Sequence, residues 1–477
     1  MSGERGVVAT GSYLPRFRLD ADVVREAWGS SPGVSSARVP AADEDALTMA
    51  IAAAEDALAD AVDAGIEAGD LAYLGIATST PPVEEGAFAS RAVRALGLPE
   101  EIRTGAATQD TAAGADVVTE AAAADGPALA VAADAPRAEP GTTDAGMGAG
   151  AAAFLFAAVD GGSKVPRLLD RADHADEYPG VRFREAGSRD VESIDITTYE
   201  RGAITDCVAS AAAGLGLDPE SVTGLAVHQP TPKLAGRIVR ALPYGSIDRQ
   251  GQVANEAGDL GAAGVPLALL DALAEAGHDD VTVAAFFGGG ARGVALAFSG
   301  GGTTAPDVDG GESLSYSRYL RERGHVVTGE VAGGGAHVSL PTWRESLDAR
   351  YRLAAGRCTE CGALTFPAEG ACRRCGARDS FERVELPREG RVAANTVIGQ
   401  GGAPPEFGPQ QDRGGAFGVA VVEFELDGES VFMPAQLTDA DPSAVEIGDR
   451  VRATIRRIYE QEGVARYGAK FVPVREG

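Results

Sequence analysis

Four cysteines near the C-terminus have the most specific chemical spacing in this sequence. Cys358 and Cys361 form one C-x-x-C pair, and ten residues later Cys372 and Cys375 form a second. A glycine follows the second cysteine of each pair, as expected of tight turns that present two thiolates to one metal ion. The pattern predicts a closed, structural zinc site without a position for a substrate, and iron in a rubredoxin-like site is the alternative.

A histidine in a proline-containing turn is the second group that could do chemistry. The apolar residues 225–227 lead into His228, and a segment of helical pattern with Lys233 and Arg237 follows the turn. Imidazole exchanges protons near neutral pH, and cations on successive helical turns can hold phosphate groups. The alternatives are a core histidine and a solvated helix face.

The fifth cysteine, Cys207, lies in an alanine-rich segment of helical pattern. A reactive thiolate needs an electropositive and accessible setting, which this segment does not provide. We therefore expect Cys207 to be a buried packing residue.

The elements that position the histidine follow an alternating pattern over residues 1–299. Helical patterns occur at 45–64, 198–217 and 265–276, and apolar strand patterns at 74–77, 128–133, 225–227 and 281–287. This alternation predicts a layered α/β domain, and its two cycles indicate a duplicated half.

The pattern changes after residue 299. Residues 299–307 have the composition of a flexible linker, and we expect a linker with connecting helices over 300–350, including 316–321 and 343–351, with a glycine run at 333–335. The zinc ribbon is expected over 351–385. Strand patterns at 390–398, 417–426, 430–437, 450–459 and 464–474 predict an all-β OB-fold barrel over 386–477.

Length and charge limit the possible classes of protein. The 477 residues are too many for one ordinary core, and the formal net charge is -28. Such a surface opposes nucleic-acid binding and suits high salt, so we expect a halophilic source. Because no apolar stretch is long enough for a signal core or a membrane span, we expect a soluble, cytoplasmic protein that does not bind a membrane.

Several stretches in order resemble the archaeal hydroxymethylglutaryl-CoA synthase family of the thiolase superfamily. They are residues 6–16, 28–29, 39–45, 148–154, 228–233 and 287–290. The C-terminal part is similar to the zinc-ribbon and OB-fold protein that accompanies thiolases. The resemblance implies a duplicated thiolase-like fold over 1–299, acyl-CoA as ligand or substrate, a homodimer, and an acetyl-CoA acetyltransferase (thiolase) as a partner.

The catalytic positions of that family are only partly kept. The resemblance implies a cysteine, a glutamate and a histidine, and of these only His228 is present. Thr111 falls at the cysteine, Ser79 at the glutamate, and Asp259 at an asparagine that assists the oxyanion. A threonine hydroxyl is a weak nucleophile without a base, and an ionised aspartate would repel an oxyanion.

The remaining residues of the resemblance concern the ligand. Lys233 and Arg237 would bind the CoA phosphates, and Gly288 and Gly289 would let backbone amides approach the thioester.

Three functions follow from this pattern. The first is an enzyme that makes or breaks a carbon–carbon bond in an acyl-CoA without an acyl-cysteine, with His228 as the base. The second is a non-catalytic acyl-CoA-binding scaffold for a partner thiolase or synthase. The third is an authentic synthase with a substituted nucleophile.

Overall fold

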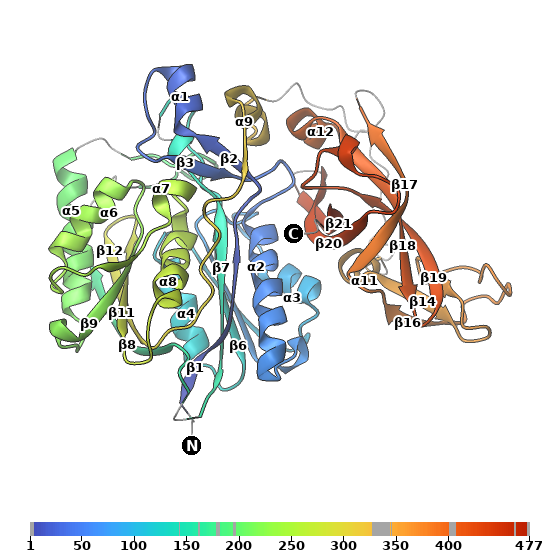
Figure 1. Ribbon diagram of the computed structural model, residues 1–477, viewed down its shortest axis with the longest axis horizontal. Coiled ribbons are helices and arrows are strands. Elements are labelled where there is room, and N and C mark those ends of the chain that lie inside the picture. The colour runs from blue at the N-terminus through green and yellow to red at the C-terminus, as the bar shows by residue number, and fades with distance from the viewer. Residues whose placement is uncertain are drawn as a thin grey trace. The chain divides into compact units, whose positions relative to one another are not determined.

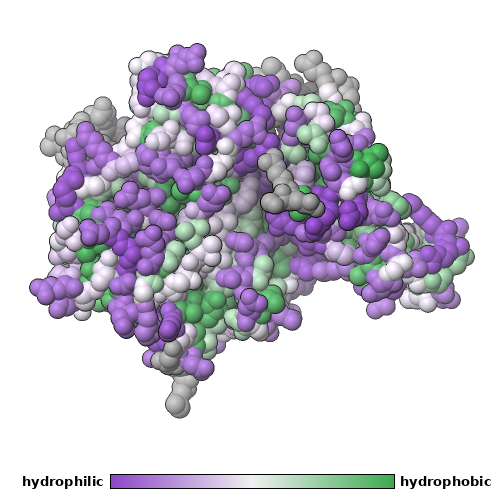
Figure 2. Space-filling model, viewed as in Figure 1, coloured by the Kyte–Doolittle hydropathy of each residue, from purple (hydrophilic) through white to green (hydrophobic). Residues whose placement is uncertain are grey.

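The computed structural model describes residues 4–142, 144–160, 163–177, 182–193, 197–326, 344, 346–399, 407–461 and 464–474. The chain forms two compact units, Met1–His325 and Val326–Gly477 (Figure 1). None of the helices in these described ranges is long and apolar enough to cross a membrane. Hydrophilic residues cover most of the face seen in Figure 2.

The first sheet of the N-terminal unit has the order β1-β7-β6-β4-β5. Its strands are β1 (Arg5–Tyr13), β7 (Gly150–Ala158), β6 (Ala128–Asp134), β4 (Tyr73–Thr78) and β5 (Arg103–Thr108). The helices beside it are α2 (Ala46–Ala61), α3 (Ala89–Leu96) and α4 (Ala113–Ala122). A capping box of Asp45 and Thr48 fixes the start of α2.

The second sheet has the order β10-β9-β11-β12-β8. Its strands are β10 (Arg249–Gly251), β9 (Val222–Val227), β11 (Val281–Gly288), β12 (Arg292–Ser299) and β8 (Arg167–Ala175). The helices beside it are α5 (Thr197–Ala213), α6 (Pro232–Ala241), the short α7 (Ala254–Ala257) and α8 (Gly264–Ala274).

The two sheets repeat one pattern of strand directions. From β5 to β1, successive pairs are parallel, parallel, antiparallel and antiparallel, and the same order holds from β10 to β8. Helices α4 and α8 pack between the sheets in one shared core (Figure 1). Gly114 permits their close approach, since a Cβ there would lie 2.9 Å from Pro266. The predicted duplicated, layered α/β fold is confirmed.

Part of the predicted linker packs on the N-terminal unit. Strand β13 (Glu312–Ser313) pairs with β2 (Phe17–Asp20), which pairs with β3 (Ser36–Val39). Helix α9 (Tyr316–Glu322) lies beside α1 (Ala21–Trp28). The buried guanidinium of Arg38 donates to the carbonyls of Asp307 and Val308 at 3.1 and 3.0 Å. A glycine-rich composition therefore did not prevent ordered packing here.

Two other parts of that region lie outside the described residues, namely the glycine run 333–335 and Trp343. The domain limits given from the sequence, 1–299, 300–350, 351–385 and 386–477, stay predictions.

The C-terminal unit contains a zinc ribbon and an OB-fold sheet. Helix α11 (Leu347–Arg352) precedes the ribbon strands β14 (Ala354–Cys358), β15 (Leu364–Thr365) and β16 (Phe381–Glu385). The OB strands β17 (Glu389–Ile398), β18 (Phe417–Leu426), β19 (Glu429–Gln436), β20 (Arg450–Gln461) and β21 (Val464–Pro473) form a sheet in the order β19-β18-β17-β20-β21. A bridge between Leu437 and Phe471 curls its ends toward each other. The predicted strands and barrel type are confirmed.

Short helical turns complete the described elements. The 3-10 turns are η1 (Val62–Ala64), η2 (Ala68–Asp70), η3 (Asp144–Gly146), η4 (Pro219–Ser221), η5 (Gly261–Ala263) and η7 (Pro442–Ala444), and α12 (Gly408–Gly414) precedes β18. Of these, η5 matters most for the site, because it lies between Asp259 and the start of α8.

Candidate functional site

Ser79 directly follows β4, and its hydroxyl is fixed by a carboxylate from the adjacent strand. The Ser79 Oγ donates to Asp134 Oδ2 at 2.6 Å, and the Ser79 N–H donates to the same oxygen at 3.2 Å. Asp134 ends β6, is fully buried, and also accepts the Ala262 N–H at 2.8 Å. Ser79 therefore has an internal partner for its proton and is not placed to act as a base.

Thr111 lies two residues before the start of α4. Its hydroxyl donates to the carbonyl of Phe287, near the end of β11. A carbonyl oxygen can hold the hydroxyl proton but cannot remove it, so no base activates Thr111 through this contact.

His228 directly follows β9 and is almost completely buried. Its Nε2 accepts the backbone N–H of Leu260 at 3.0 Å, so the neutral ring carries its proton on Nδ1. The Nδ1 atom is buried and has no hydrogen-bond partner among the described residues. Gly264, the first residue of α8, packs against the ring, because a Cβ there would lie 2.1 Å from Cδ2.

Asp259 forms an ion pair that the sequence did not predict. Its Oδ2 accepts from Arg182 Nη1, and its Oδ1 accepts the Gly261 N–H at 3.0 Å and lies 3.8 Å from His228 Nε2. Burial alone would raise the pKa of Asp259, but the Arg182 guanidinium and the Gly261 N–H hold it well below the ordinary value. Asp259 is therefore ionised and is neutralised by Arg182.

A cavity of about 430 Å³ lies beside these groups. Ser79, Thr111 and Gly289 line it, together with Arg182 and Arg184, whereas His228 and Asp259 are not part of its wall. The structure thus brings together three of the predicted residues at one cavity and places the histidine and aspartate outside it.

Residues 182–193 form one side of this cavity, and we name them the cover loop. Arg184 Nη2 donates to the Ser79 carbonyl at 2.8 Å, and the Gly187 N–H donates to Glu84 at 2.7 Å. Farther along the loop, Asp190 pairs with Arg137 at 2.7 Å. The cover loop has no apolar periodicity, so pattern reasoning had no signal from which to find it.

The predicted phosphate ligands lie on α6. Lys233 is exposed and Arg237 is half-buried, and neither side chain lines the cavity. Neither forms an ion pair with any described residue. Gly288 ends β11, where a Cβ would lie 2.9 Å from the Asp110 carboxyl carbon, so a larger residue there would have to displace the Asp110 side chain.

Cys207 is a buried residue of α5. Its thiol lies 3.5 Å from the Ala291 carbonyl, and burial, with the nearby Asp176 and Asp206, raises its pKa. The expectation of a packing residue is confirmed, and Cys207 cannot replace the missing nucleophile.

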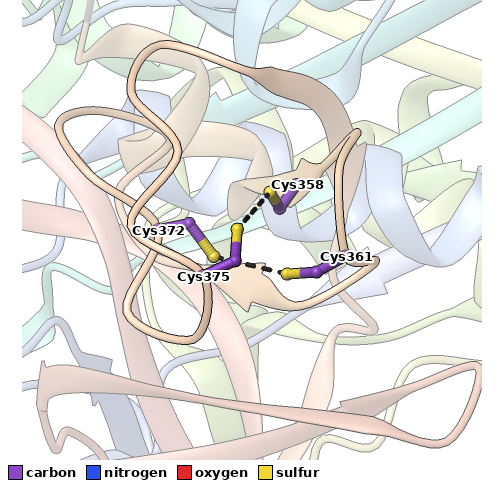
Figure 3. Close-up of side chains that lie close together, drawn as sticks. All are labelled: Cys358, Cys361, Cys372 and Cys375. Carbon is purple, nitrogen blue, oxygen red and sulfur yellow. Dashed lines mark hydrogen bonds between the residues drawn. The ribbon is translucent and has the colours of Figure 1, made fainter.

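The four C-terminal cysteines meet at one point (Figure 3). All four Sγ atoms lie within 4.8 Å of one another, with 3.7 Å between Cys358 and Cys375 and 3.6 Å between Cys361 and Cys372. A tetrahedral zinc with sulfur bonds of about 2.3 Å separates its ligands by roughly 3.8 Å. Backbone N–H groups of Cys375 and Arg374 lower the pKa of Cys372, whereas burial and the neighbouring thiols raise the pKa of Cys361, so the crowded sulfurs share few protons. The sulfur positions therefore fit a zinc ion.

Two family models match the C-terminal unit. One is described as ChsH2, rubredoxin-like zinc ribbon domain, and matches residues 347–382; the other is described as ChsH2, C-terminal OB-fold domain, and matches residues 383–456. The predicted zinc ribbon and OB-fold are thereby confirmed.

The same unit resembles small archaeal proteins over nearly their whole length. A DUF35 domain-containing scaffold protein of Methanocaldococcus jannaschii is 34% identical over 135 residues, covering 28% of this chain and 89% of that protein. One of Methanothermobacter thermautotrophicus is 33% identical over 137 residues, covering 28% of this chain and 96% of that protein.

The N-terminal unit resembles short parts of synthases. Hydroxymethylglutaryl-CoA synthase of Thermoplasma acidophilum is 40% identical over 60 residues, 11% of this chain and 17% of that enzyme. That of Caldivirga maquilingensis is 31% identical over 104 residues, 20% of this chain and 29% of that enzyme. These matches span less than a third of each synthase.

Solved structures show how far the fold extends. HMG-CoA synthase complexed with CoA has a TM-score of 0.60 at 16% identity, covering 70% of this chain and 94% of that one. The 3-oxoacyl-(acyl carrier protein) synthase III of Pseudomonas aeruginosa PAO1 has a TM-score of 0.54 at 23% identity, covering 63% of this chain and 99% of that one. The chain therefore belongs, through its C-terminal unit, to the DUF35 domain-containing scaffold proteins, and joins this unit to a region with the thiolase fold of hydroxymethylglutaryl-CoA synthase.

Proposed function

We propose that this protein is a non-catalytic scaffold that binds acyl-CoA and presents it to a partner thiolase or synthase. One observation carries the proposal: all four polar side chains at the predicted catalytic positions are held by internal contacts. Ser79 bonds Asp134, Thr111 bonds the Phe287 carbonyl, His228 Nε2 accepts from Leu260, and Asp259 pairs with Arg182.

These contacts do not serve a condensation reaction. Acyl transfer needs an activated nucleophile and groups that stabilise developing negative charge. Among the described residues, Thr111 hydrogen-bonds the Phe287 carbonyl. Asp259, at the position that the resemblance gives to an asparagine that assists the oxyanion, is ionised and would repel such a charge. A chain with these two substitutions is better suited to hold an acyl-CoA than to transform it.

Three features support acyl-CoA as the ligand. A protein of the same fold was solved with bound CoA, and the scaffold relatives match the C-terminal unit. The cavity of about 430 Å³ is large enough for an acyl group with part of a pantetheine arm. Lys233 and Arg237 are cations on one helix that would meet the CoA phosphates.

The cysteine cluster of this scaffold would hold one structural zinc. The four thiolates fill a tetrahedral shell, so no position is left for a substrate. The ion would fix the two turns of the ribbon and take no part in the handling of acyl-CoA.

A second candidate function is carbon–carbon bond formation or cleavage on an acyl-CoA without an acyl-cysteine. It is favoured by the buried Nδ1–H of His228, which has no partner among the described residues and remains for a ligand. An authentic synthase with Thr111 as nucleophile would instead form a covalent acetyl adduct at that residue.

The decisive experiment compares binding with turnover. Isothermal titration with acetyl-CoA and acetoacetyl-CoA should show binding, while product assays and intact-mass measurement should show neither turnover nor an acetyl adduct. A partner thiolase should co-purify with the protein and bind it again when the two are mixed. Light scattering of the purified protein alone measures its oligomeric state. Turnover by the purified protein that His228→Ala abolishes would contradict the scaffold, and an acetyl adduct lost in Thr111→Val would establish the synthase.

A further inference from the structure

A short stretch of chain after β6 contacts both the cover loop and the end of α9. We name this stretch, residues 136–142 and 144, the bridging segment. On the cover-loop side, the Arg137 carbonyl accepts the Val191 N–H at 2.6 Å, and Arg137 Nε donates to the Asp190 carboxylate at 2.7 Å. Because Val191 lines the cavity, the bridging segment is bonded directly to the cavity wall.

The same segment holds the residues that end the N-terminal unit. The Tyr319 hydroxyl donates to the Asp144 carbonyl at 3.0 Å, and His325 Nε2 lies 2.9 Å from Asp144 Oδ2. The Arg323 guanidinium donates to the Pro136 carbonyl. The side chains of His325 and Asp144 are 6% and 1% exposed. The chain passes from His325 to the second compact unit, so these contacts anchor the end of the first.

The guanidinium of Arg137 joins the two sides. While its Nε holds Asp190, its Nη1 donates to the Arg323 carbonyl at 3.3 Å. Arg323 is the C-cap of α9, where carbonyls lack partners within the helix and a cation is favourable. The Arg137 and Asp190 side chains are 20% and 31% exposed, so salt screens their attraction only in part. Because one planar group makes both contacts, a shift of Asp190 moves the group that holds α9.

The cover loop can pass a contact in the cavity to Asp190. Phe183 and Val191 both line the cavity. Two backbone hydrogen bonds of 2.9 and 2.8 Å pair Phe183 with Glu192 and so tie the two ends of the loop together. A ligand that packs on Phe183 and Val191 therefore restrains Asp190, the residue before Val191.

We propose that Arg137 couples the cavity to the end of the N-terminal unit, so that a ligand in the cavity tightens the anchorage of α9 and His325. The ligand part of this proposal rests on the scaffold function. It makes the cavity a regulator of the point from which the chain continues to the zinc-ribbon unit. Coupling between two sites is reciprocal, so a loosened α9 weakens the hold on the ligand.

Hydrogen exchange of the full chain, read by mass spectrometry, tests the coupling first without any ligand. The reporters are the amides of Arg323, Gly324 and His325, each of which donates to a carbonyl of α9. Such an amide exchanges only when its hydrogen bond opens, so its rate measures how firmly the end of α9 is held. Amides of the buried helix α8 serve as the reference for global stability.

Two variants of the cover loop are compared with the wild type. Asp190→Asn removes the charge that orients Arg137 and keeps the shape of the side chain. Glu192→Gln is the matched control, because Glu192 is an exposed acid of the same loop that does not line the cavity. The reporters should exchange at least about fivefold faster in Asp190→Asn than in the wild type, and within about twofold of it in Glu192→Gln.

A double variant shows whether the effect runs through Arg137. In an Arg137→Gln background, Asp190→Asn should change the reporter rates by less than about twofold. Equal rates in Asp190→Asn and the wild type would overturn the proposal. A full additional effect in the double variant would also overturn it, and so would an equal rise in the α8 amides, which would indicate global destabilisation.

Acetyl-CoA then tests the direction from the cavity to α9. Bound acetyl-CoA should slow the reporters by about threefold or more in the wild type and by less than about twofold in Asp190→Asn. Binding seen by calorimetry without slower exchange in the wild type would overturn the coupling and leave the scaffold function standing. Absence of binding would instead contradict the scaffold function, and the ligand-free comparison of the variants would then decide on the coupling alone.

Discussion

The hydroxyl of Ser79 donates a hydrogen bond of 2.6 Å to Asp134, the last residue of the adjacent strand. The same carboxylate accepts the backbone N–H of Ala262, which lies in the second half of the duplicated fold. One buried carboxylate therefore joins the ends of β4 and β6 to the turn η5. Ser79, which lines the cavity, is therefore also part of a contact that joins the two halves of the fold.

Replacement of Asp134 by asparagine should destabilise the N-terminal unit by about 3 kcal/mol. An amide has a single acceptor oxygen. Its NH2 group would face either the Ala262 N–H, at the place of Oδ2, or the Ala135 N–H, at the place of Oδ1. Urea unfolding followed by tryptophan fluorescence measures the change. Asp63→Asn, at an exposed position of η1, is the control and should shift the free energy of unfolding by less than about 0.5 kcal/mol. Equal effects of the two variants would show that the carboxylate does not hold the halves together.

Zinc should be bound at one ion per chain and be required by the C-terminal unit. Cys358→Ser removes one of four thiolates, so elemental analysis after native purification should show loss of the metal, and a strong chelator should unfold the ribbon. Cys207→Ser is the matched control, because this buried thiol lies in the other unit and should leave the zinc content unchanged. Metal-free wild-type protein with a folded ribbon would refute the assignment, and iron would support the rubredoxin-like alternative.

The sequence predicted the fold far better than the site. The central helices, the buried strands and the five OB strands have clear patterns of apolar residues, because the side chains that each element buries in a core must be apolar. The hydrogen bond between Ser79 and Asp134 and the ion pair between Arg182 and Asp259 join residues that are 55 and 77 positions apart. No local pattern encodes such a pairing. The resemblance placed Asp259 at an asparagine position but gave no indication that Arg182 would pair with it.

Lys233 and Arg237 of α6 should contribute to the affinity for the nucleotide part of CoA and not to the binding of the acyl group. Lys233→Ala and Arg237→Ala should each weaken CoA binding by about three- to tenfold, with a smaller effect at high salt. Arg240→Ala, on the exposed last turn of the same helix, is the control. Titration with acetyl-CoA and with acetyl-pantetheine separates the contribution of the phosphates from that of the acyl-pantetheine part, since the second ligand lacks the nucleotide phosphates. Equal losses for both ligands would place these cations away from the phosphates.

Acid should remove the stabilisation that Asp259 gains from Arg182. The folded-state pKa of Asp259 is held below its unfolded value of about 3.9, so this stabilisation is fully present above that pH. It is lost as the pH falls from about 4 toward the folded-state pKa. The difference in unfolding free energy between the wild type and Asp259→Asn should therefore shrink between pH 6 and pH 3. A difference that stays constant over this range would mean that Asp259 is not ionised in the folded protein.

Salt should stabilise the whole chain, because its charge is strongly unbalanced. With 70 acidic and 42 basic residues, the formal net charge of -28 creates self-repulsion in the folded state, and the unfolded chain relieves that repulsion by expanding. Screening shortens the range of the repulsion from about 10 Å at 0.1 M salt to about 3 Å at 1 M. Calorimetry should show a melting temperature higher by about 5 °C or more in 2 M KCl than in 0.1 M KCl. Potassium glutamate, which supplies the same cation, should act similarly if screening is the cause. An unchanged melting temperature would remove the physical basis for a halophilic source.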